Sequence, residues 1–142
     1  MTRKIKIIIV TLAIGVLAVS LGRIVWSVGD GPAATGIQIA LLSILDIVQS
    51  LLFGLGIAVL LFGWPWFKNL SALSLRMKIL LFLSVIWLLT SWWPHVGFHI
   101  ITGEDLWGII KIDYAFHLTA IVASIVVFRA FVIVSRQIGT FV

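Results

Sequence analysis

Residues 37–63 read IQIALLSILDIVQSLLFGLGIAVLLFG, a run in which Asp46 is the one charged side chain. A helix that spans a bilayer needs about 20 mainly apolar residues, and this run is longer than that. It lacks the strict alternation of apolar and polar residues that is typical of a membrane β-barrel strand. Because only helices and closed barrels satisfy all backbone hydrogen bonds within lipid, the run predicts a transmembrane helix.

Three further apolar runs predict three further spans, at about residues 5–28, 75–93 and 105–134. The first ends at the turn-forming segment 29–32, and the third ends before Pro94, where a helix is expected to stop. No internal repeat or linker divides the chain. We therefore expect a single transmembrane domain over residues 1–142. Its fold class is all-α: an integral membrane four-helix bundle with a short outer re-entrant or interfacial segment between the third and fourth helices.

The composition agrees with a membrane protein. Hydrophobic residues make up 62% of the chain, charged residues make up 11%, and the mean hydropathy is +1.25. Soluble domains average about 45–50% apolar and about 25% charged residues, which argues against a water-soluble or nucleic-acid-binding protein despite the net charge of +5. The chain has no Cys, so disulfides, thiol catalysis and cysteine-based metal centres are excluded.

The distribution of cations predicts the orientation in the membrane. Cytoplasmic loops of membrane proteins carry an excess of Lys and Arg. If the amino terminus is cytoplasmic, only Arg23 and Lys111 of the ten cations lie toward the outer face. We therefore expect both termini in the cytoplasm and the chain in the plasma (inner) membrane. The cations then on the inner side are Arg3, Lys4, Lys6, Lys68, Arg76, Lys78, Arg129 and Arg136.

A secretory signal is the competing interpretation of the first run. Basic residues at positions 3, 4 and 6 precede an apolar stretch, and Ala18-Val19-Ser20 resembles a cleavage site after Ser20. The apolar run continues through Val28, however, beyond the length of such a signal. We favour a retained transmembrane helix.

Ionisable residues within the spans recur at similar depths. Counting 1.5 Å per residue from the inner interface of each helix places Arg23, Asp46, His95 and Asp113 about 24–27 Å up and His117 about 18 Å up. In a hydrocarbon layer about 30 Å thick, this level lies in the outer third. A lipid-facing charge is costly there, so we expect these groups to face one another.

The three histidines and three of the five acids fall within residues 95–117. His95 and His99 are spaced i, i+4 and share one face if Pro94 opens a short helix or turn after the third span. Asp113 and His117 have the same spacing on the fourth helix. Two such pairs can supply nitrogen and oxygen ligands to a divalent metal such as zinc or copper. The sequence predicts the metal ligands His95, His99, Asp113 and His117. A bis-histidine haem is disfavoured because the count separates His117 from His95 by about 8 Å in depth.

The neighbouring charges have both structural and functional interpretations. Arg23, Asp46, Glu104 and Asp105 are predicted to form a polar wall beside the site. Glu104 and Asp105 also suit the first turn of the fourth helix, where acids complement the helix dipole. Arg23 and Asp46 suit either an ion pair between the first two helices or a role in proton transfer. Asp113 can equally serve only to fix the tautomer of His117.

Two functions follow from this pattern. The first is a small membrane protein whose outer His/Asp cluster binds a divalent metal or relays protons; whether it is an enzyme is left open. The alternative is a non-catalytic accessory or assembly subunit of a larger membrane complex, since the short loops leave little room for a substrate pocket. The expected partners are the lipid bilayer and other membrane subunits or further copies of the chain, and not nucleic acid.

Overall fold

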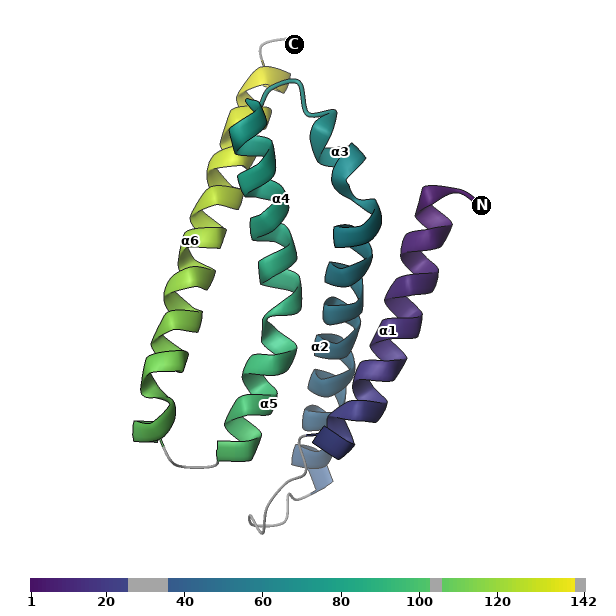
Figure 1. Ribbon diagram of the computed structural model, residues 1–142, viewed down its shortest axis with the longest axis vertical. Coiled ribbons are helices and arrows are strands. Elements are labelled where there is room, and N and C mark those ends of the chain that lie inside the picture. The colour runs from purple at the N-terminus through teal and green to yellow at the C-terminus, as the bar shows by residue number, and fades with distance from the viewer. Residues whose placement is uncertain (26–35, 103–105, 140–142) are drawn as a thin grey trace.

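A computed structural model describes residues 1–25, 36–102 and 106–139, and all regular elements in these ranges are helices (Figure 1). Four helical segments are long and apolar enough to cross a membrane, at Arg3–Gly22, Gly36–Phe62, Leu75–His99 and Ile110–Gln137. For these residues, this confirms the prediction of an all-helical fold with four helices long and apolar enough to span a membrane, and it is consistent with an integral membrane protein. The helices are α1 (Arg3–Val25), α2 (Gly36–Phe62), α3 (Trp64–Lys68), α4 (Leu75–Thr90), α5 (Trp92–Thr102) and α6 (Leu106–Gly139).

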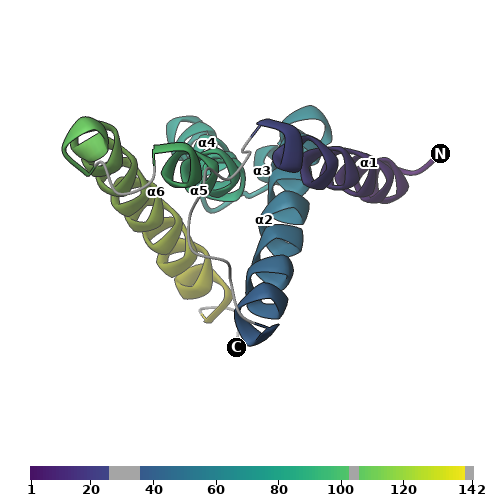
Figure 2. The same cartoon turned by 90° about the horizontal axis from the view of Figure 1, so that it is seen from below.

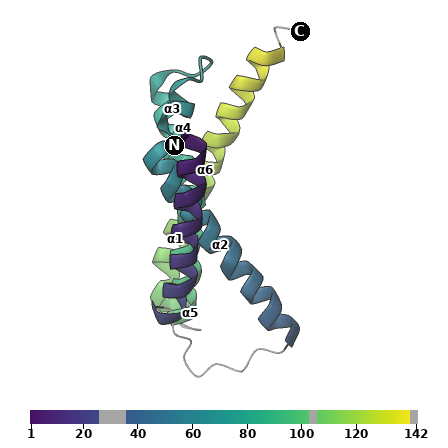
Figure 3. The same ribbon diagram turned by 90° about the vertical axis from the view of Figure 1, so that its right-hand side faces the viewer.

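The helices pack in chain order and leave the bundle open. α1 packs on α2, α2 packs on α4 and α5, and these two helices pack on α6. α1 and α6 lie on opposite sides of this row (Figure 2). Figure 3 shows α2 and α6 sloping away from the layer that contains α1, α4 and α5. Much of each helix surface therefore remains exposed and apolar, as expected for side chains that face lipid.

Small residues allow α1 and α2 to approach closely. A Cβ atom added to Gly54 of α2 would overlap the carbonyl oxygen of Thr11 and would lie 2.9 Å from the backbone nitrogen of Gly15. Close backbone approach at small residues is the usual basis of helix association in lipid, where apolar burial supplies little driving force. Gly56 plays the same part between α2 and α4, where an added Cβ would overlap a methyl group of Thr90.

The third span continues past the residue that was expected to end it. α4 ends at Thr90, and after Ser91 the chain resumes as α5, so that the apolar span extends to His99. Pro94 is the third residue of α5. In the first turn of a helix, the backbone N–H that proline lacks would have no partner within the helix. The apolar span therefore extends beyond the expected end at residue 93, with Pro94 in the first turn of a short further helix. Whether α5 is an interfacial segment stays a prediction.

At the end of the molecule away from α5, α4 packs against α6. The rings of Trp64 and Phe67 in α3 pack edge-on against Phe82, with centroids 5.3 and 5.2 Å away. Leu73 and Leu81 pack with Ala130 of α6 in a buried cluster. Figure 1 shows the N-terminus, α3 and the C-terminal end of α6 at this end, and α5 at the other. The contact between α5 and α6 thus lies far from the termini.

Candidate metal centre

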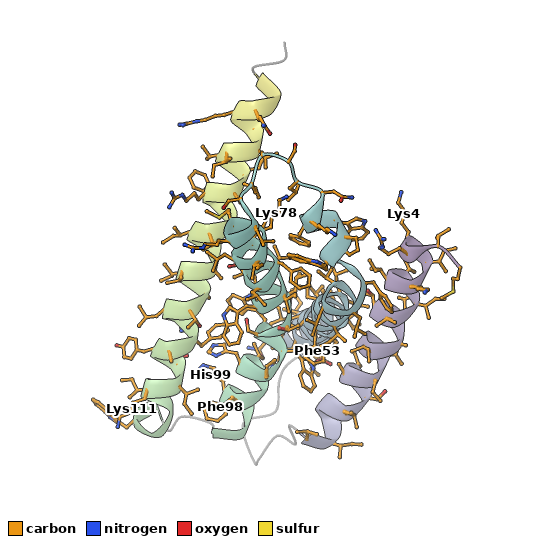
Figure 4. The ribbon with its side chains drawn as sticks, turned by 45° about the horizontal axis from the view of Figure 1, so that its top comes forward. Lys4, Phe53, Lys78, Phe98, His99 and Lys111 are labelled. Atoms are coloured by element: carbon orange, nitrogen blue, oxygen red, sulfur yellow. The ribbon has the colours of Figure 1, made fainter. Side chains whose placement is uncertain are left out.

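Two pairs of polar side chains meet between α5 and α6. His95 and His99 are one turn apart on α5, and Asp113 and His117 are one turn apart on α6. Residues at this spacing share one helix face. Figure 4 shows His99 projecting from α5 toward α6. The packing of these two helices therefore gathers all three histidines of the chain at one place.

The carboxylate of Asp113 lies among the three imidazole rings. His99 Nε2 is 2.9 Å from Asp113 Oδ1, a hydrogen-bonding distance. His95 Nε2 is 3.6 Å from the same oxygen, and His117 Nδ1 is 3.5 Å from Oδ2. One carboxylate thus lies within 3.6 Å of a nitrogen atom of every histidine.

A backbone hydrogen bond fixes the tautomer of His117. Its Nδ1 is 2.8 Å from the carbonyl oxygen of Asp113. A carbonyl oxygen only accepts hydrogen bonds, so Nδ1 must carry the proton and donate it. The lone pair of a neutral His117 ring is then on Nε2, which is free to act as a ligand. Such a bond to the second ring nitrogen is common among metal-binding histidines.

Aromatic rings pack against one side of the site. The His95 ring lies flat on the ring of Phe116, with centroids 3.7 Å apart and an interplanar angle of 12°. Trp92 packs edge-on against the other two rings, 5.1 Å from Phe116 and 6.2 Å from His95. These contacts restrict the orientation of His95 and leave its side chain only 10% exposed.

Exposure increases across the site from His95 to His117. The side chains of Asp113, His99 and His117 are 31%, 36% and 52% exposed. The cluster is therefore closed on the side of Phe116 and accessible on the side of His117.

Three of the four predicted ligands meet a geometric condition for metal binding. One ligand atom each from His95, Asp113 and His117 lies within 4.8 Å of the other two. Ligands at about 2.0–2.1 Å from a tetrahedral zinc ion are about 3.3 Å from one another. Side-chain rotations that draw the atoms together by about 1.5 Å would complete such a site. His99 is not part of this group, and its Nε2 is hydrogen-bonded to the side-chain carboxylate of Asp113.

The predicted polar wall stays a prediction, because three of its four members have positions or side chains outside the described part of the chain. Asp46 on α2 forms no ion pair with any side chain that the structure describes, and the side chain of its predicted partner Arg23 is not among these. Glu104, Asp105 and the side chain of Arg23 lie outside the described residues, so their roles stay predictions. Lys111 is exposed and points away from α5 (Figure 4), in agreement with a side chain that reaches for lipid headgroups.

The depth estimate was wrong for His95 and His117. The ring centroids of His95 and His117 are 5.3 Å apart, whereas the residue count gave about 8 Å in depth alone. Side chains lean toward the N-terminus of their helix, and α5 and α6 run in opposite directions (Figure 1). The two rings therefore lean toward each other. The depth argument against a haem fails, although the Asp113 carboxylate lies within 3.6 Å of both rings.

Sequence reasoning missed Trp92 and Phe116 as parts of the site. Phe116 lies three residues after Asp113, which places it on the same face of α6. An aromatic residue at i+3 from a candidate ligand was therefore a usable signal. The contact of Trp92 with Phe116 depends on the packing of α5 against α6, which no local pattern encodes.

No protein-family model matches this chain, and neither the curated proteins nor the solved structures include one that is significantly similar to it.

Proposed function

We propose that this chain is a membrane protein that binds a divalent metal ion between α5 and α6, through His95, Asp113 and His117. The observation that carries the proposal is the convergence of one ligand atom from each of these residues to within 4.8 Å. Two imidazoles and a carboxylate form a donor set found in zinc sites with an open coordination position. Binding would occur near the outer face of the plasma membrane, with both termini in the cytoplasm.

The number of histidines favours a ligand-binding role over a structural one. One imidazole N–H would suffice to satisfy Asp113, and His99 already supplies it at 2.9 Å. His95 and His117 are then additional polar groups within an apolar span, where polar side chains are costly and are usually functional. A metal ion would use their lone pairs and offset that cost.

The donor types point to zinc or copper. Calcium and magnesium prefer sites built from oxygen atoms, whereas imidazole nitrogen suits zinc and copper. A bound ion with an open position can activate water or, as copper, exchange electrons.

Proton relay is the second candidate, and a separate observation favours it. The three imidazole nitrogens lie 2.9–3.6 Å from one carboxylate, and exposure rises from 10% at His95 to 52% at His117. A proton entering at His117 could pass through Asp113 to His95. Imidazole is suited to such transfers near neutral pH.

Elemental analysis of the purified protein tests the proposal. The wild type in detergent, dialysed against a small excess of Zn(II) or Cu(II), should retain about one metal ion per chain. The double variant His95→Ala/His117→Ala should retain none. Tyr114→Phe is the matched control, because Tyr114 is an exposed neighbour on the same helix and its variant should bind as the wild type does.

Two outcomes would contradict metal binding and separate the alternatives. A wild type that retains no metal, together with a double variant of unchanged thermal stability, would favour the accessory-subunit function. A wild type that retains no metal but conducts protons in vesicles, with conduction lost in the double variant, would favour the relay.

A further inference from the structure

We infer that His99 is not a metal ligand but a positioning residue, whose Nε2–H holds Asp113 Oδ1 and directs the carboxylate toward the ion. This inference rests on the proposed metal binding and assigns a distinct role within that site. The sequence groups His99 with the ligands, because its spacing from His95 is the same as that of His117 from Asp113. The side-chain contacts distinguish His99 from the ligands.

The distances distinguish His99 from the other histidines. Only His99 is within hydrogen-bonding distance of the Asp113 carboxylate, at 2.9 Å, while the nitrogens of His95 and His117 lie 3.6 and 3.5 Å from it. The three residues whose ligand atoms converge within 4.8 Å do not include His99. The Nε2 atom of His99 is already hydrogen-bonded to Asp113 Oδ1, so this nitrogen is not available to a metal ion.

The direction of the hydrogen bond follows from the chemistry of the two groups. An ionised carboxylate only accepts, so Nε2 of His99 must donate, and the lone pair of a neutral His99 ring is then on Nδ1, on the side of the ring away from the carboxylate. Asp113 then uses Oδ1 for His99 and turns Oδ2 toward the side of His117, whose Nδ1 is 3.5 Å away. The carboxylate is held in one rotamer before any ion arrives.

An outer partner of this kind has a characteristic energetic effect. Removal of a group that orients a metal ligand typically costs 10–100-fold in metal affinity and leaves the ligands themselves in place. Removal of a true ligand changes the coordination sphere. Affinity and ligand count together therefore distinguish the two roles.

Cu(II) titration of the full-length protein in detergent, combined with pulsed EPR, provides the test. EPR counts the imidazoles bound to Cu(II), and competition with a chelator gives the affinity. His99→Ala should bind Cu(II) 10–100-fold more weakly than the wild type, with an unchanged count of two imidazoles. His99→Gln, whose amide N–H can donate in place of Nε2–H, should restore affinity to within about threefold, since the hydrogen bond is retained.

Other results would contradict the proposed role of His99 or the proposed metal binding. A count that falls by one in both His99 variants would make His99 a ligand. Wild-type affinity in His99→Ala would make it a bystander. His117→Ala is the positive control: it should lower the number of imidazoles bound to Cu(II) by one if EPR reports on this site. If His99→Ala does not fold, the Gln variant decides, because a ligand role predicts the loss of one imidazole there too. A wild type that binds no Cu(II) would overturn the proposed function itself.

Discussion

The imidazole ring of His95 on α5 stacks on the phenyl ring of Phe116 on α6, with centroids 3.7 Å apart and 12° between the ring planes. Phe116 is itself buried and lies on the same face of α6 as Asp113. The helix that carries the carboxylate therefore also sets the orientation of the imidazole opposite it. The site is built by a packing contact as much as by its polar groups.

Phe116→Leu is expected to weaken metal binding without abolishing it. Leucine keeps an apolar side chain at this position but loses the stacked ring, and aromatic pairs contribute about 0.5–1.5 kcal/mol beyond area burial. The expected loss of affinity for Zn(II) or Cu(II) is about two- to tenfold, as measured by competition with a chelator. Phe128→Leu, on an exposed part of the same helix, is the control. Equal metal affinities in Phe116→Leu and Phe128→Leu would show that the stacked ring does not contribute to metal binding.

Asp113→Asn separates charge from hydrogen bonding. The amide oxygen can still accept from His99, and the side chain keeps its shape, but the negative charge that attracts and ligates a divalent ion is lost. We expect loss of bound metal with a melting temperature close to that of the apo wild type. A variant that keeps stoichiometric metal in elemental analysis would remove Asp113 from the ligand set.

The four long apolar helices and the His/Asp cluster could be predicted from sequence because each depends on a local pattern. The apolar run at residues 37–63 is too long and too regular for anything but a helix in lipid. The i, i+4 spacing places His95 beside His99 and Asp113 beside His117 in any α-helix. That these two faces meet required only that polar groups avoid lipid.

Features that depend on relations between helices could not be predicted in this way. The opposite directions of α5 and α6 bring His95 and His117 closer than a residue count along either helix implies. The open row of helices depends on which helix faces pack together. The glycines at positions 15 and 54 mark the packed faces of α1 and α2, but this is clear only once their contacts are known. Pro94 was expected to end the third helix. The local sequence is the same whether a proline follows the end of one helix or lies in the first turn of the next.

Gly54→Ala is expected to destabilise the contact between α1 and α2. The added methyl group would overlap the Thr11 carbonyl oxygen and crowd the Gly15 nitrogen, which are backbone atoms that cannot rotate away. Overpacking of this kind costs about 1–3 kcal/mol, which should appear as a lower melting temperature in detergent. Gly36→Ala is the control, since nothing lies within 4 Å of a Cβ atom there. A Gly54 variant as stable as this control would contradict the close packing.

Ser50→Ala is expected to be neutral or stabilising. Ser50 is fully buried, at 0% exposure, and its hydroxyl has no hydrogen-bond partner in the described part of the chain. A buried hydroxyl without a partner costs about 1–3 kcal/mol, and alanine removes it with little change in volume. Thermal unfolding of the two proteins makes the comparison. A clearly lower melting temperature in the variant would mean that the hydroxyl has a partner in the folded protein, such as a bound water.

The predicted orientation can be tested with single cysteines, because the natural chain contains none. Lys68, at the end of α3, and Lys111, near the start of α6, lie toward opposite ends of the molecule (Figures 1 and 4). The excess of cations at the end that carries Lys68 predicts that this end is cytoplasmic. A membrane-impermeant maleimide applied to intact cells should therefore label Lys111→Cys and not Lys68→Cys. Permeabilisation should make both accessible. Labelling of Lys68→Cys alone in intact cells would invert the topology and place the metal site on the cytoplasmic side.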